Sequence, residues 1–232
     1  MEPASESRFD PNPATQLLLE IANEQSLEHL LRTLVDRAVE RPDLVCAQVW
    51  LIEKGDLCAS CPRRSECPDQ SRCLHLVVTK GKSILGPTKR AKQFEDLTAR
   101  VPLGIGPLGS AVASGEQRFV KDLQKQPPSM AGPAWLREER IRGYSISPIR
   151  FKGEPLGALV GFTRDNLPEE SQPWGRIFAD HVGAAIANAR AFEEIQRLKA
   201  QLELQNDYLQ EQVVEARAFG DLGRAPERCA NP

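Results

Sequence analysis

The chain has 232 residues, of which 30 are basic and 32 acidic, so its formal net charge is −2. The chain therefore lacks the excess of positive charge that is typical of proteins that bind nucleic acid or an anionic membrane. With 41% hydrophobic and 27% charged residues, the composition is that of an ordinary globular protein with one substantial core.

The N-terminal segment 1–13 is polar, contains proline and has no apolar core of the kind found in secretory signals. No apolar stretch approaches the roughly 18 residues that a membrane helix needs. We therefore expect no membrane association and a cytoplasmic location, where thiols stay reduced. Residues 1–13 are expected to form a disordered tail.

Two helices are expected at the start of the domain. Asn12 and Pro13 are typical of a helix start. Ser26 has the character of a second N-cap, and apolar residues then recur at intervals of three and four from Leu27 to Val39. This spacing predicts an amphipathic helix with one buried face.

The middle of the chain alternates between strand and helix patterns. Strands are expected at 45–52, 74–79, 118–120, 144–151 and 156–163. Short helices are expected at 109–114 and 135–141, and the last two strands flank Gly153, which predicts a hairpin. The order predicts an α+β fold, a central antiparallel sheet with helices packed on it.

A long helix is predicted from about Ser171 to about Arg217, which is too long to bury within a small domain. Its distal half has an apolar seam with intervals of 3, 4, 4, 3, 4 and 3: Ile195, Leu198, Leu202, Asn206, Leu209, Val213 and Ala216. We expect residues 193–218 to form a parallel coiled coil in a homodimer, with 219–232 as a tail. The alternative is a lone helix folded back on the domain.

The strongest chemical pattern is a C-x2-C-x5-C-x5-C array formed by Cys58, Cys61, Cys67 and Cys73. Thiolates are soft ligands that suit iron–sulfur clusters and zinc. A structural zinc site usually takes two C-x2-C pairs and only one is present, so the spacing favours an iron–sulfur cluster, with 4Fe-4S as the preferred type. Zinc, a redox-formed disulfide pair and inert cysteines are the alternatives.

The remaining candidates around this array have simpler interpretations. Four thiolates carry a charge of about −4, and Arg63, Arg64 and Arg72 are placed to offset part of it. His75 falls in a strand pattern, so a surface or core position is expected rather than a metal ligand. Of the other two cysteines, Cys46 lies in a strand pattern and is expected to be buried as a small hydrophobic residue. Cys229 lies in the terminal segment and is expected to have no structural or chemical role.

No catalytic constellation is apparent. The histidines, His29, His75 and His181, fall on unrelated elements. Gly104–Gly109 matches G-x-G-x-x-G, but Pro102 interrupts the segment before it and the following helix is short, so a tight turn explains the glycines better than a dinucleotide site. We expect no catalytic residues and no enzyme activity.

Several segments together resemble a GAF domain over residues 14–192: the 27–39 helix, the run 100–115, Phe119–Asp122, the strand 145–149 and the hairpin segment 153–159. The resemblance implies five or six antiparallel strands with a helical layer, and a sensory role. The segment 206–224 resembles the linker of sigma-54-dependent transcription activators, in which a sensory GAF domain precedes an AAA+ ATPase. The chain departs from that family because it contains no phosphate loop and no helix-turn-helix.

These observations lead to one expected function and one alternative. We expect a sensor that binds a metal centre through its four loop cysteines and relays redox, gas or iron status through a dimeric helix. Its partner would be an AAA+ sigma-54 activator output module, with no direct DNA binding by this chain. The alternative is a small-molecule-binding GAF module with a structural zinc in the 58–73 loop.

Overall fold

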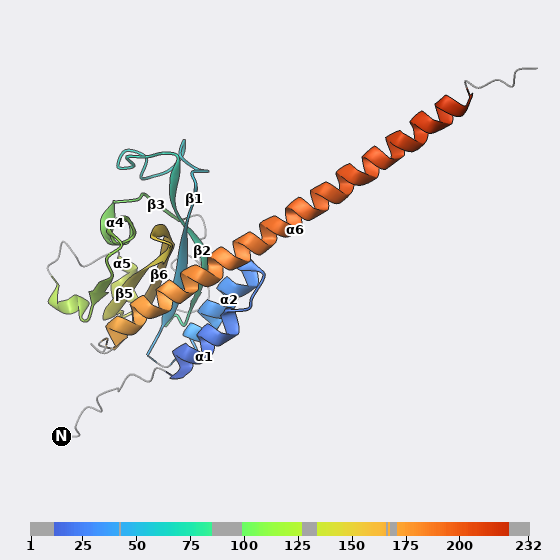
Figure 1. Cartoon of the computed structure of the whole chain (residues 1–232). Helices are drawn as coiled ribbons and strands as arrows, with labels where there is room; N and C mark the ends of the chain where they lie inside the picture. Colours follow the sequence, from blue (N-terminus) through green and yellow to red (C-terminus); the bar gives the residue numbers. More distant parts are fainter. Residues whose placement is uncertain are drawn as a thin grey trace, which may run out of the picture.

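The computed structural model describes residues 12–41, 43–84, 99–126, 134–165, 167 and 171–222, with side chains placed as far as residue 215. A twisted antiparallel sheet forms the centre, and a single long helix crosses one of its faces and then leaves the domain (Figure 1). The predicted α+β class, with a sheet, packed helices and a long C-terminal helix, is confirmed. Among the described helices, none has an apolar stretch that would cross a bilayer.

The sheet has six strands in the order β3-β2-β1-β6-β5-β4. Their bounds are β1 Cys46–Lys54, β2 Arg72–Gly81, β3 Arg100–Val101, β4 Arg118–Val120, β5 Gly143–Phe151 and β6 Glu154–Thr163. Every neighbouring pair is antiparallel. Because β1 pairs with β2 on one side and β6 on the other, it is central, which agrees with its nearly continuous apolar run.

The β5–β6 hairpin turns at Lys152 and Gly153, where the backbone φ angles are 51° and 88°. Two consecutive residues with positive φ match the twist of the flanking strands in a two-residue turn. Glycine adopts this geometry without a steric cost, which explains the turn predicted at Gly153.

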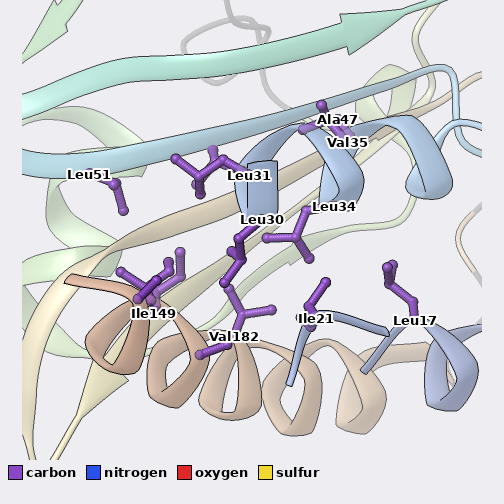
Figure 2. Close-up of a cluster of buried hydrophobic side chains, with 14 of the residues drawn as sticks. Leu17, Ile21, Leu30, Leu31, Leu34, Val35, Ala47, Leu51, Ile149 and Val182 are labelled. Atoms are coloured by element: carbon purple, nitrogen blue, oxygen red, sulfur yellow. The ribbon is translucent and has the colours of Figure 1, made fainter. Parts of the chain in front are cut away.

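Helices α1 (Asn12–Ile21), α2 (Leu27–Ala38) and the first part of α6 (Ser171–Leu222) cover one face of the sheet (Figure 1). The Ser26 side chain caps α2 by accepting a hydrogen bond from the His29 amide at 3.3 Å. Figure 2 shows the resulting core, in which side chains from α1, α2 and α6 meet those of the sheet. Its labelled members include Ile21, Leu30, Leu51, Ile149 and Val182.

The other face of the sheet carries a second apolar cluster, packed under α4 (Gly106–Ser114), η1 (Leu123–Lys125) and α5 (Ala134–Glu138). Trp50, Leu76 and Phe162 from the sheet contribute to it. Because both faces are covered, the loops and edges of the sheet are the parts that a ligand or partner can reach.

Helix α6 leaves the domain just after its contacts with β1 and α2. The guanidinium of Arg190 pairs with Glu53, and Glu193 accepts a hydrogen bond from the Leu27 amide at 2.8 Å. From Ile195, which is 60% exposed, to Val213 at 49%, the large apolar side chains are uncovered. The packed part of α6 therefore ends near Glu193.

Candidate metal centre

The cysteine segment is the loop that joins the two neighbouring strands β1 and β2. In their ladder Glu53 faces Cys73 and Lys54 faces Arg72. The Gly55 amide then donates to the Ser71 carbonyl at 2.8 Å, which closes the base of the loop. The loop therefore extends from one end of a paired and well-packed part of the sheet.

All four predicted ligands line one cavity within this loop: Cys58, Cys61, Cys67 and Cys73. Its volume is about 20 Å³, which is room for one water-sized body. Cys73 lies at the start of β2 and is buried, whereas the other three are partly exposed. The structure thus brings together residues that are up to fifteen positions apart in the sequence.

Two of the four thiols bond to the backbone of their own loop. Cys58 Sγ donates to the Gln70 carbonyl at 3.0 Å, and Cys67 Sγ donates to the Asp69 carbonyl at 3.2 Å. Within the described ranges, no three His, Cys, Asp or Glu side chains converge closely enough to hold a metal ion. The five cysteines in those ranges are free thiols.

Burial and the neighbouring Cys58 together raise the pKa of the Cys73 thiol to about 11. Nearby Arg100 acts in the opposite direction, since a cation favours the thiolate. Cys73 is therefore a protonated thiol at neutral pH. Binding to a metal cation would deprotonate it, because a coordinating thiol loses its proton to the ion's charge.

Two of the three arginines proposed to offset thiolate charge lie at the cavity. Arg64 and Arg72 line it, and Arg64 Nη1 donates to the carbonyl of Cys58 at 3.3 Å. Arg63 instead pairs with Glu66, its Nη2 lying 2.9 Å from the carboxylate, and does not line the cavity.

Arg100 is a lining residue that sequence reasoning missed. It donates to both carboxylate oxygens of Asp56, at 3.0 and 2.7 Å, and only 14% of its side chain is exposed. This hydrogen bonding holds the pKa of Asp56 well below its usual range. The pair fastens β3 to the base of the loop, and no local pattern predicts it because the two residues are 44 positions apart.

Gly55 is a second residue that the pattern did not single out. A Cβ atom there would lie 2.5 Å from Cys58 Sγ and 2.8 Å from the Gln70 carbonyl oxygen. Any larger residue would displace Cys58, so the close approach of the loop's two ends requires glycine.

The other candidates occupy ordinary structural positions. His75 lies in β2, with Nε2 buried and 3.6 Å from Asp56 Oδ1, and burial lowers its pKa. Cys46 is fully buried in β1, as expected for a small hydrophobe. Cys229 lies outside the described residues. Gly109 packs where a Cβ would be 2.2 Å from the Pro102 carbonyl oxygen, which supports the turn interpretation.

A family model described as GAF domain matches residues 24–187. Because this is more than half of the chain, the protein belongs to the GAF domain family, whose members serve widely as small-molecule-binding sensory modules. The predicted family is confirmed. No curated protein matches the sequence significantly.

Solved structures show the same fold at low identity. The GAF domain of a phosphoenolpyruvate-protein phosphotransferase from Coxiella burnetii is 23% identical with a TM-score of 0.54, covering 78% of this chain and 94% of that one. Free methionine-R-sulfoxide reductase from Neisseria meningitidis, in complex with its substrate, is 18% identical with a TM-score of 0.55, covering 82% and 99%. A methyl-accepting chemotaxis protein fragment is 16% identical with a TM-score of 0.52, covering 76% and 98%.

The reductase structures correct the expectation that this chain is not an enzyme. That expectation rested on the lack of a recognisable catalytic pattern and on the sensory role that the resemblance implies, yet the same fold occurs in enzymes named as free methionine-R-sulfoxide reductases. A fold does not determine function, because activity depends on the residues of the site. The GAF fold alone therefore leaves the catalytic status of this chain undecided.

Proposed function

We propose that this chain is a sensory GAF module whose 58–73 loop binds an iron–sulfur cluster, of the 4Fe-4S type, through Cys58, Cys61, Cys67 and Cys73. The observation that carries the proposal is that these four thiols line a single cavity at the end of the β1–β2 hairpin. Four cysteines are the ligand set that such clusters take.

The surroundings of the cavity support an anionic metal–thiolate centre. Arg64, Arg72 and Arg100 line it together with the four sulfurs, and the carboxylates of Asp56 and Asp69 line it as well. Asp56 pairs with Arg100 and Asp69 with Arg72, so the charged lining has a small positive excess that would offset part of the charge of bound thiolates. The cluster would supply redox chemistry when bound, and the cysteines would hold it while the arginines stabilise its charge.

The loop can open to enclose a cluster larger than its present cavity without disturbing the sheet. Its internal backbone hydrogen bonds are short-range turns, such as the Arg64 amide to the Cys61 carbonyl at 3.0 Å and the Cys67 amide to the Arg64 carbonyl at 3.3 Å. Opening these turns breaks no strand pairing, because the β1–β2 ladder ends at Lys54 and Arg72.

A second candidate is a single zinc ion in the same loop, acting as a structural element of a small-molecule-binding GAF module. The observation that favours it is the cavity volume of about 20 Å³, which is closer to the size of one ion than to that of a cluster. The thiols would have to move closer together to bind the ion. Both candidates use the same four ligands, and they differ in colour and in redox activity.

For the output we propose a homodimer formed by the distal half of α6, acting in the cytoplasm on an AAA+ sigma-54 activator module. The exposed apolar seam between Ile195 and Val213 supports the dimer. A net charge of −2 does not favour DNA binding by this chain, so in this proposal the partner makes the DNA contacts.

The test is purification without oxygen, followed by a visible absorption spectrum and assays of iron, acid-labile sulfide and zinc. A brown protein that contains iron and sulfide supports the cluster. A colourless protein with one zinc per chain supports the second candidate. A protein that holds neither metal rules out both forms of the proposal.

A further inference from the structure

A second, larger cleft of about 620 Å³ lies at the open edge of β5. It shares none of its lining residues with the cysteine cavity. The volume is within the range of small-molecule pockets, roughly 300–1,000 Å³. Strand β5 forms one wall, the turn between α4 and β4 forms another, and the first turns of α6 form the third.

The cleft exists because β4 is short. Its three residues pair only with Tyr144–Ile146 of β5, so the edge of β5 is open from Ser147 onward. Helix α6 approaches this part of the sheet closely, since a Cβ at Gly175 would lie 2.9 Å from Ser147 Oγ and one at Gly183 would lie 2.1 Å from the Arg150 carbonyl oxygen. The helix and the strand thus form fixed walls.

Charged side chains of both signs line the cleft. Arg176 and Asp180 are one helical turn apart on α6, and Glu116 lines the cleft from the α4–β4 turn. Within the described residues, none of these three forms an ion pair, even though Arg176 and Asp180 are neighbours on one helix face. Arg150 is held in place by donating to the Gly153 carbonyl at 2.7 Å.

An added strand is a poor fit for this open edge. Pro148 has no N–H to offer a pairing strand. The exposed side chains of Arg150 and Lys152 are of the charged kind that protects strand edges from pairing. The cleft therefore suits a compact ligand rather than an extended peptide.

We propose that the cleft binds a small zwitterion of the α-amino acid class. Side chains at positions i and i+4 have Cβ atoms about 5–6 Å apart, so Arg176 and Asp180 can contact two opposite charges carried on one carbon atom. The guanidinium of Arg176 binds the ligand's carboxylate through two parallel hydrogen bonds, and the Asp180 carboxylate binds the ligand's ammonium group. Arg150 and Glu116 contact the rest of the ligand.

The experiment is calorimetric titration of the full chain with the proteinogenic α-amino acids, first in pools and then singly. Succinate and putrescine are the controls that carry charges of one sign. The variants are Arg176→Gln and Asp180→Asn, with Lys199→Gln as a matched control on the exposed part of the same helix. All three residues are exposed, so folding is expected to be unchanged and is checked by circular dichroism.

We expect saturable binding of at least one amino acid, weakened about ten-fold or more by each cleft variant, because each removes a hydrogen bond between charged groups. Lys199→Gln should bind as the wild type does. Failure of every amino acid to bind overturns the proposal, as does binding that neither cleft variant alters. Succinate or putrescine binding as tightly as the amino acid also overturns it, because the site would then recognise one charge only.

Discussion

Glu53 and Arg190 connect the strand that carries the cysteine loop to the helix that leaves the domain. The Arg190 Nη2 atom lies 2.5 Å from Glu53 Oε1, although the residues are 137 positions apart. Glu53 is also the cross-strand partner of Cys73, the buried member of the cysteine set. Glu53 thus lies between the buried cysteine and the part of α6 from which the helix leaves the domain.

The Glu53–Arg190 pair is expected to hold α6 against the sheet at its exit. Glu53→Gln or Arg190→Gln should increase amide hydrogen exchange in α6 near residue 190. The cost in global stability should be about 1 kcal/mol or less, because both side chains are a third or more exposed. The charge-swapped double variant Glu53→Arg, Arg190→Glu should recover much of the protection. Equal exchange in the wild type and the single variants would show that the pair does not hold the helix.

The metal content should depend on the four loop cysteines and on no other cysteine. Replacing Cys58, Cys61, Cys67 or Cys73 singly by alanine removes one of four metal–thiolate bonds, so most of the metal should be lost or the cluster should decay quickly in air. Metal analysis of anaerobically prepared variants is the measurement.

The control for that series is Cys46→Ala. Its side chain is fully buried in β1, so the variant should lose about 1 kcal/mol of stability through a small cavity and keep its metal. Cys229→Ala should change neither quantity. Full metal content in all four loop variants would contradict the proposed site.

The apolar seam of α6 should hold a dimer together. Leu202 lies on the seam and is 66% exposed, whereas Leu204 is 72% exposed and lies on the opposite side of the helix. Leu202→Glu should shift the protein toward monomers in sedimentation at micromolar concentration, because two charges would be buried in the seam. Leu204→Glu is the matched control and should sediment as the wild type does. A wild type that is already monomeric would disprove the dimer.

Glu139 is expected to be a major stabilising side chain of the α5 region. It is fully buried and accepts hydrogen bonds from Arg164 at 2.9 Å, from the Ile84 amide at 3.0 Å and from the Ser83 hydroxyl. Glu139→Ala removes the side-chain acceptor of these hydrogen bonds and should lower the free energy of unfolding, measured in urea, by about 2 kcal/mol or more. The exposed Glu154→Ala should stay within about 0.5 kcal/mol of the wild type. A similar midpoint for both variants would refute this role.

The sequence by itself determined the local elements of this protein. Three of these elements depend on residues within a few positions of one another: the Ser26 cap, the Gly153 turn and the Leu27–Val39 helix. A sequence pattern can therefore predict each of them. The spacing of the four cysteines also indicated a shared site, because a loop between two adjacent strands keeps its own residues close together.

Only the tertiary structure decided which distant side chains meet. The pairing of β3 with β2 brings Arg100 to Asp56. The packing of α6 on the sheet brings Arg190 to Glu53. The cleft beside β5 likewise depends on where β4 ends and where Gly175 allows the helix to approach. Strand register and helix packing are set by the burial of the whole core, and a register shift of one residue in β1 or β3 would direct Glu53 or Arg100 to the opposite face of the sheet.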